Sequence, residues 1–245
     1  MFMDQATQLR RIVNRRQREI SGMSLPSLIG FLGSHGGINT AEAVAIYARR
    51  MCELCNSVLI LDFHSGNGDN PDLAALFQAE NEPGLADVLM AQKPLLECIQ
   101  PIQPGLDLSP GAWGLDLLPG DLNKSIELLV HQIAQTGNRW NQVLFDLGTS
   151  ANRLTNGLWK ELDQAVIVTT NENEAILNAY ATIKIHASLD NNVRIALIVV
   201  PSHSPNVSLE QAQERLTDAC QRFLGIELVD PTRRLCTHRD EVSPS

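Results

Sequence analysis

The stretch Gly33-Ser34-His35-Gly36-Gly37-Ile38-Asn39-Thr40-Ala41 separates a short apolar run at 28–32 from a run with helical periodicity at 42–55. A glycine-rich turn between a buried strand and a helix is a common phosphate site, because backbone N–H groups and the helix dipole both favour an anion there. Loops of this kind usually carry a lysine, and this one carries none. The stretch therefore predicts a strand, a loop and a helix, and leaves open what the loop binds.

The composition is that of a soluble globular protein. The chain has 245 residues, of which 44% are hydrophobic and 19% charged, and this length suits one large domain. No apolar run reaches the ~18 residues of a membrane span, and the N-terminus lacks the apolar core of a signal peptide. Five cysteines fit a reducing interior, and the C-x-x-C stretch at 52–55 is interpreted as two free thiols. We expect a cytoplasmic protein.

The charge is divided unevenly along the chain. Five arginines against two acidic residues give residues 1–20 a charge of +3, which leaves −12 for the rest of a chain whose net charge is −9. Nucleic-acid binding needs clustered lysine and arginine to neutralise phosphates. The acidic body therefore argues against a nucleic-acid partner.

Strands and helices alternate from residue 27 onward, and several candidate strands are continuous apolar runs. Such runs suit a parallel sheet covered by helices on both faces. The expected strands are 28–32, 57–62, 115–118, 142–146, 164–169 and 193–200. The expected helices are 40–55, 73–77, 85–90, 122–135, 152–161, 172–187 and 208–223. We therefore predict an α/β fold with a doubly wound, mostly parallel sheet flanked by helices.

The first residues predict a separate element. Residues 3–20 have the pattern of one amphipathic helix, with a narrow apolar stripe and arginines around it; the stripe consists of Ala6, Leu9, Val13 and Ile20. A stretch with Gly and Pro at 21–26 then breaks the helix. The predicted organisation is a helix and linker at 1–24, an α/β domain at 25–228 and a polar tail at 229–245.

The carboxyl ends of the strands are the expected place for a ligand. The loop that starts at Gly33 should meet there the turns that follow Asp62 and Asp146. His35 and His64 would add two imidazoles, and such residues are good metal ligands. We nevertheless expect solvated side chains in this pocket and no metal.

Several motifs follow one another in a fixed order. They are His35-Gly36-Gly37-Ile38-Asn39-Thr40-Ala41, Asp62-Phe63-His64, Gly84-Leu85-Ala86-Asp87-Val88-Leu89, Asp146-Leu147-Gly148-Thr149 and the block at 168–184. They resemble K-G-G-x-G-K-T, D-x-D, G-L-x-D-V-L, D-x-x-A/G and V-T-T-P-E-P-T-S-I-T-D-A-Y-A-x-I-K of the MinD/ParA family, the deviant P-loop ATPases of the SIMIBI class. The resemblance implies a P-loop NTPase-like fold.

The N-terminus resembles one branch of that family. The stretch at 4–10 matches the D-Q-A-x-x-L-R motif of FlhG (FleN) proteins, which regulate flagellar number and placement. In that branch the helix engages and stimulates FlhF, a signal-recognition-type GTPase. The resemblance implies that Gln5 positions water or ribose at the partner's active site, that Leu9 anchors the apolar contact, and that Asp4 and Arg10 set the register.

The chain departs from the family pattern at the residues that carry its chemistry. His35 replaces the lysine that reaches across a dimer, and Thr40 replaces the lysine that grips the β- and γ-phosphates. Ala41 stands where a hydroxyl residue ligates magnesium. Asn39 stands where a glycine lets the backbone approach phosphate, and His64 where a carboxylate orients the attacking water.

These replacements predict a loop without catalysis. Phosphoryl transfer depends almost wholly on positioning and electrostatic stabilisation, and the loss of one donor can cost ~100-fold in rate. We therefore expect no ATPase activity, no catalytic residue and no cofactor, although backbone amides could hold an anion, or ATP with magnesium, weakly. The degenerate site consists of Gly33, His35, Gly36, Gly37, Asn39, Thr40, Asp62, His64 and Asp146.

Three functions remain open at this point. We favour an FlhG-like pseudo-ATPase that binds an FlhF-type GTPase, or another flagellar assembly protein, through its N-terminal helix. The second is a divergent ATPase that keeps slow hydrolysis through Asp62 and Asp146. The third is a binding module that restrains a flagellar transcription activator.

The same features predict the protein's state in the cell. The narrow apolar stripe of the first helix makes membrane binding weak at most. Without a nucleotide sandwich the usual dimer loses its driving force, so we expect a monomer. A partner would then recruit it to the cell pole or the membrane.

Overall fold

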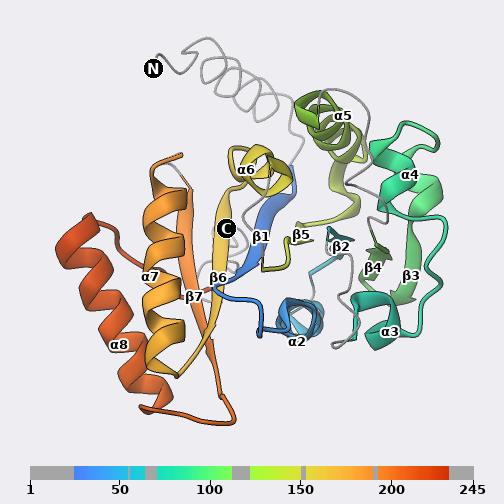
Figure 1. Ribbon diagram of the computed structural model, residues 1–245. Helices are drawn as coiled ribbons and strands as arrows, with labels where there is room; N and C mark the ends of the chain where they lie inside the picture. Colours follow the sequence, from blue (N-terminus) through green and yellow to red (C-terminus); the bar gives the residue numbers. More distant parts are fainter. Residues whose placement is uncertain are drawn as a thin grey trace, which may run out of the picture.

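The core of the fold is one sheet, in which the strands lie in the order β3-β4-β2-β5-β1-β6-β7 (Figure 1). The computed structural model describes residues 25–54, 56–63, 71–111, 122–149, 153–189 and 193–231. All neighbouring strands in this order are parallel except β3 and β4, which pair antiparallel. The bounds are β1 (Ser27–Gly33), β2 (Val58–Asp62), β3 (Gln100–Gln103), β4 (Leu106–Ser109), β5 (Gln142–Asp146), β6 (Gln164–Thr170) and β7 (Arg194–Val200).

Helices connect these strands, as expected for a doubly wound fold. The helices are α2 (Thr40–Glu53), α3 (Leu73–Phe77), α4 (Leu85–Leu89), α5 (Leu122–Gln135), α6 (Arg153–Trp159), α7 (Asn173–Ala187) and α8 (Leu209–Ala219). Shorter helical turns are η1 (Leu95–Cys98), η3 (Gly137–Arg139) and η4 (Cys220–Leu224), the last of which is a π-helical extension of α8.

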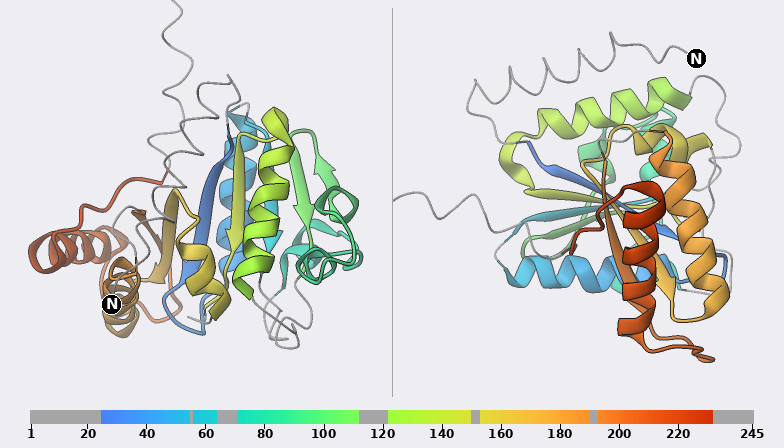
Figure 2. Two further views of the ribbon diagram at one scale, coloured as in Figure 1. Left: turned by 90° about the horizontal axis from the view of Figure 1, so that it is seen from above. Right: turned by 90° about the vertical axis from the view of Figure 1, so that its left-hand side faces the viewer.

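The sheet is buried between two layers, which the perpendicular views show (Figure 2). On one face, α2 and α3 pack against the sheet through side chains such as Val44 and Leu73, in a cluster with Phe31 and Ile60. On the other face, α4 to α8 build a second cluster around fully buried Trp159. Because both faces are covered, β2, β5 and β6 are buried along their whole length.

The predicted α/β fold with a doubly wound, mostly parallel sheet is confirmed, and most predicted elements agree with it to within two residues. Two strands at one end of the sheet were missed, the edge strand β3 and its neighbour β4. Both β3 and β4 have only four residues and lack a continuous apolar run, and β3 contains Pro101, which normally counts against a strand. The strand expected at 115–118 lies outside the described residues; the parallel neighbour of β2 on this side is β4.

Several predictions concern residues that the structure does not describe. The amphipathic helix at 3–20 lies outside the described residues, and so do the linker up to 24 and most of the tail at 229–245. The division into these three parts therefore stays a prediction. Among the described helices, none is long and apolar enough to cross a membrane.

Candidate functional site

The loop at 33–40 lies over the carboxyl ends of the central strands, as the sequence predicts. The Gly33 amide donates to the Gly148 carbonyl (2.9 Å) and the Ser34 amide to the Val168 carbonyl (2.9 Å). The Ser34 hydroxyl also bonds the hydroxyl of Thr169 at the end of β6 (3.0 Å). The start of the loop is thus tied to both neighbours of β1 before it turns toward α2.

Gly33 is required by close packing where β1 ends. A Cβ atom at this position would lie 2.7 Å from Thr149 Cγ2 and 3.1 Å from Thr40 Cγ2. The first distance is shorter than van der Waals contact allows, so any larger residue would push the loop away from β5. The absence of a side chain at Gly33 therefore lets the end of β1, the segment after β5 and the start of α2 pack closely together.

The imidazole of His35 shapes the turn that follows. Its Nδ1 accepts a hydrogen bond from the Gly37 amide (3.2 Å), and its carbonyl accepts one from the Ile38 amide (3.2 Å). The first bond fixes the tautomer, because Nδ1 is the acceptor and Nε2 therefore carries the proton in the neutral ring. This Nε2 is buried and has no hydrogen-bond partner among the described residues. Gly36 has open space around it, since no described atom lies within 4 Å of the point that a Cβ would occupy.

Asn39 caps α2. Its backbone is extended (φ −86°, ψ 94°), and its Oδ1 accepts a hydrogen bond from the Glu42 amide (3.3 Å). The side chain thus satisfies one of the free amides at the helix start, which in a phosphate-binding loop would face the anion. Asn39 is an ordinary cap residue, and the helix that it starts is regular over 14 residues.

Thr40 and Asp146 form the buried contact of the site. The Thr40 hydroxyl donates to Asp146 Oδ1 at 2.6 Å, and the Gly148 amide donates to the same oxygen at 3.0 Å. Thr40 is 2% exposed and Asp146 is fully buried. A short bond from a hydroxyl to a carboxylate is among the stronger hydrogen bonds in proteins. The carboxylate at the end of β5 is therefore bound by groups of the chain itself.

Asp62 lies beside Asp146 at the same edge of the sheet. The two residues are register partners in the parallel pair of β2 and β5, and Asp62 is 1% exposed. The backbone continues this contact, since the Phe63 amide donates to the Asp146 carbonyl (2.9 Å). The predicted convergence of Asp62 and Asp146 is thus observed. His64 lies outside the described residues, so its place relative to them stays a prediction.

A magnesium nucleotide would need groups that this loop does not offer. Between 33 and 41 the loop contains no lysine or arginine to neutralise phosphate charge. The hydroxyl at its end, that of Thr40, is directed to Asp146, and the Asn39 side chain is engaged with the first turn of α2. The residues present do not fit the family's way of holding a nucleotide. What remains is a helix N-terminus with two buried carboxylates behind it.

The other predicted sites divide between described and undescribed residues. The proposed contact residues Asp4, Gln5, Leu9 and Arg10 lie outside the described residues. Cys52 is a free thiol whose Sγ donates to the Gly105 carbonyl (3.3 Å), and burial followed by the charge of Asp107 raises its pKa. In the described ranges, no three residues of the types His, Cys, Asp and Glu come together as a metal site would require.

Sequence reasoning missed the bond between Ser34 and Thr169, which ties the loop to β6. Thr169 also donates its own hydroxyl to the Ala175 carbonyl in the first turn of α7 (3.0 Å). Its position in the V-T-T stretch that ends a strand was a usable signal. Gly148 was not singled out either; it has a positive φ of 64° and supplies an amide to Asp146.

Comparison with known proteins gives one relative in sequence. No family model matches the chain. A curated protein, the flagellum site-determining protein YlxH of Helicobacter pylori, is 27% identical over 161 residues. The match covers 65% of this chain and 53% of that protein, so the chain spans about half the length of this relative.

Comparison of structures gives the fold. A ParA-family ATPase of Chlorobium tepidum matches with a TM-score of 0.62 and 20% identity, over 83% of each chain. The cell-division ATPase MinD of Pyrococcus furiosus matches with a TM-score of 0.65 and 15% identity, over 83% of this chain and 81% of that one. At such identities the likeness shows the shared fold alone. The chain thus has the fold of the MinD/ParA ATPases, and in sequence it is similar to a flagellum site-determining protein, which supports an FlhG-like relationship within that family.

Proposed function

We propose that this protein is an FlhG-like regulator of flagellar number or placement that acts by binding a partner and not by hydrolysing ATP. The claim that the protein does not hydrolyse ATP rests on the 2.6 Å hydrogen bond between Thr40 and Asp146. This bond engages two residues that phosphoryl transfer would need for holding phosphate and metal. The name of the H. pylori relative supports the flagellar role. The MinD/ParA fold supports a task in spatial positioning.

The loss of hydrolysis follows from charge. The transferred phosphoryl group spreads negative charge over its oxygens, and cations must neutralise it. The loop from Gly33 to Ala41 supplies no cation, and the residues beside it at the strand ends, Asp62 and Asp146, are carboxyl groups that cannot supply one. Backbone amides alone at the start of α2 would bind an anion weakly. We therefore propose that neither ATP nor magnesium is part of the working protein.

The partner is proposed from the N-terminal motif. Residues 4–10 match the motif through which FlhG proteins engage an FlhF-type GTPase, and residues 1–20 carry a charge of +3 on an acidic protein. A short amphipathic helix is marginal alone and gains stability in a partner's groove. Gln5 would help to position water or ribose, Leu9 would fill an apolar pocket, and Asp4 and Arg10 would fix the register. The partner would bring the protein to the pole or the membrane.

Calorimetric titration with ATP and magnesium tests the nucleotide proposal. We expect neither saturable heat nor a rise in melting temperature up to about millimolar ligand. A ligand present at about a hundredfold its Kd would stabilise the fold by about 2.7 kcal/mol, so binding would be visible as a higher melting temperature. Saturable binding in the micromolar range would contradict the proposal. It would mean that His35, Asn39 and Thr40 build a phosphate site of another kind.

A second experiment tests the partner. The binding of the purified FlhF-type GTPase and its GTP hydrolysis rate would be measured with the wild type, Gln5→Ala and Leu9→Ala. Gln8→Ala is the matched control, because Gln8 occupies a free position of the motif. We expect Leu9→Ala to weaken binding by about tenfold or more, and Gln5→Ala to reduce stimulation. Equal effects of all three variants would show that the motif assignment is wrong.

A divergent ATPase is the second candidate, favoured by the direct register of Asp62 with Asp146 at the strand ends. Dimerisation that depends on ATP would support it, since nucleotide binding and assembly are linked in such proteins. The binding module for a transcription activator has no observation in its favour among the described residues. Binding of a partner that survives deletion of residues 1–24 would favour this third function, because the α/β domain itself would then make the contact.

A further inference from the structure

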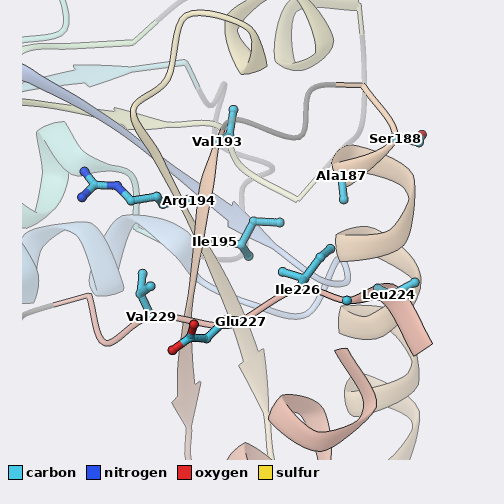
Figure 3. A pocket seen from close by; sticks show the side chains of 10 residues that line it. Ala187, Ser188, Val193, Arg194, Ile195, Leu224, Ile226, Glu227 and Val229 are labelled. Carbon is cyan, nitrogen blue, oxygen red and sulfur yellow. The ribbon is translucent and has the colours of Figure 1, made fainter. Parts of the chain in front are cut away.

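A groove lined by both apolar and polar groups opens where β7 begins (Figure 3), at the opposite end of the strands from the phosphate loop. It has a volume of about 550 Å³ and lies between the C-terminal end of α7, the first residues of β7 and the segment after η4. Its floor contains Val193 and Ile195, which are buried, and its wall contains Ile226, which is partly buried. Figure 3 shows Ile195, Ile226 and Ala187 on the α7 side of β7, with Arg194 pointing away from them.

The first described residues lie close to this groove. The Leu28 amide donates to the Asp163 side chain (3.0 Å), and the Arg194 amide donates to the Asp163 carbonyl (3.3 Å). A single residue thus links the start of β1 to the start of β7. Since β6 alone separates the two strands, they lie about 10 Å apart. The four residues 21–24 could span about 13 Å when extended, which is enough to bring a preceding helix to the groove.

The C-terminal segment leaves the groove in another direction. Val229 pairs with Ala196 at the edge of β7, and the Pro231 carbonyl then accepts a hydrogen bond from the Tyr47 hydroxyl (3.2 Å). Tyr47 belongs to α2, which covers the opposite face of the sheet. The residues after 231 also contain few large apolar side chains. They are therefore poor candidates for filling the groove.

We propose that residues 1–24 dock in this groove in cis, as an autoinhibitory contact. The predicted helix at 3–20 has a narrow apolar stripe that contains Leu9 and Val13, and the groove offers partly buried apolar side chains such as Ile226 within reach of its linker. The arginines beside the stripe would meet Glu227 at the groove's border and a body with a charge of −12. Docking would bury apolar area on both sides, which is its driving force.

The contact would regulate the proposed function, on which this consequence rests. Leu9 cannot lie in the groove and in a partner's pocket at the same time. If the docked state were favoured about tenfold, the apparent affinity for the partner would be about tenfold weaker than the intrinsic one. A variant with a blocked groove should then bind the partner about tenfold more tightly than the wild type.

Amide hydrogen exchange of the full-length protein tests the docking without any partner. We expect residues 5–20 to exchange at least about tenfold more slowly in the protein than in a synthetic peptide of residues 1–24. Ile226→Asp should abolish this slowing by charging the groove, and Leu9→Asp should abolish it from the side of the helix. The matched control is Ile46→Asp, which charges a 64% exposed side chain on α2 and should leave the slowing unchanged.

Each outcome supports or overturns the docking. Exchange of residues 5–20 at the peptide's rate in the wild type would overturn the proposal, and so would slowing that survives both Ile226→Asp and Leu9→Asp. Because Leu9 lies outside the α/β domain, its variant tests the contact even if Ile226→Asp unfolds the protein. Slowing that is lost on about a hundredfold dilution would mean docking onto a second copy, and would also overturn docking in cis.

The test separates this inference from the proposed function. Slow exchange in the free protein, combined with no binding of an FlhF-type GTPase, would leave the docking intact and remove the proposed partner. Fast exchange in the free protein, combined with tight binding of an FlhF-type GTPase, would overturn the docking and leave the proposed partner intact. Only slow exchange together with tighter partner binding by Ile226→Asp supports both.

Discussion

At the scale of single residues, the Thr40 hydroxyl is engaged with a carboxylate at the position where the resemblance to the MinD/ParA motif would place a lysine. Thr40 donates to a fully buried carboxylate, and its removal would leave Asp146 with one protein donor fewer. We predict that Thr40→Val lowers the free energy of unfolding by about 2 kcal/mol, because hydrogen bonds to buried charged groups are costly to lose. Urea denaturation checks this. Thr182→Val in α7 is the control, and equal stability of both variants and the wild type would show that the bond contributes nothing.

His186 predicts a dependence of stability on pH. Its ring stacks on Trp159 (centroids 4.3 Å apart), is 1% exposed, and has no hydrogen-bond partner for either nitrogen among the described residues. Burial lowers its pKa below the ordinary value of 6.5. The unfolded chain therefore binds a proton at this site more readily than the folded one. The resulting stability is fully present above about pH 6.5 and is lost as the pH falls toward the lower pKa of the folded state.

We therefore expect the free energy of unfolding to fall between about pH 7 and pH 5, by at most about 1.4 kcal/mol per pH unit from this group. His186→Phe keeps an aromatic ring against Trp159 and should flatten the curve in this range. His203→Gln changes an exposed histidine and should not. Urea denaturation at several pH values compares the three proteins. A curve of the same slope for His186→Phe would show that other groups cause the dependence.

At the scale of elements, α2 begins on a side-chain cap where a phosphate-binding helix begins on free amides. Asn39 Oδ1 accepts from the Glu42 amide. We predict that Asn39→Ala destabilises the protein by about 1 kcal/mol, whereas Asn39→Asp, which keeps the acceptor, costs less. Thermal unfolding monitored by circular dichroism distinguishes them. Equal losses for both variants would mean that the cap hydrogen bond does not hold the helix start.

The short elements show where sequence reasoning fails. The helix at Leu122–Gln135 and the strand at Gln142–Asp146 were predicted with their observed bounds, because a long periodic stretch or an apolar run is a local signal. Strands β3 and β4 have no such signal. They form because β4 completes the parallel edge beside β2, and β3 then folds back on β4. Their pairing is a property of the sheet and not of their own sequence.

At the scale of the whole molecule, the proposed loss of nucleotide binding predicts the oligomeric state. A nucleotide-sandwich dimer needs phosphates that both subunits bind, and the loop here offers no cation for them. We expect a monomer of 26.9 kDa, and the same mass with and without ATP and magnesium. Sedimentation velocity measures this directly. A shift toward twice the mass on addition of ATP would instead favour the divergent ATPase.

The sequence by itself determined the doubly wound fold and the residues that gather at the strand ends, and its motifs gave the resemblance to the MinD/ParA family. These conclusions depend on apolar runs, glycine turns and the rule that parallel strands end at one edge, all of which are local or topological. The sequence alone therefore places Asp62 and Asp146 side by side, as the register of β2 and β5 confirms.

Only the tertiary structure decided how the replaced residues are used. The motif resemblance implies that Thr40 stands in the place of a lysine, but the sequence does not show that the hydroxyl reaches Asp146, which is 106 positions further along the chain. The same holds for Ser34 with Thr169 and for the groove between α7 and β7. Such contacts depend on how distant segments are positioned within ångströms, and that positioning is set by the packing of the whole core.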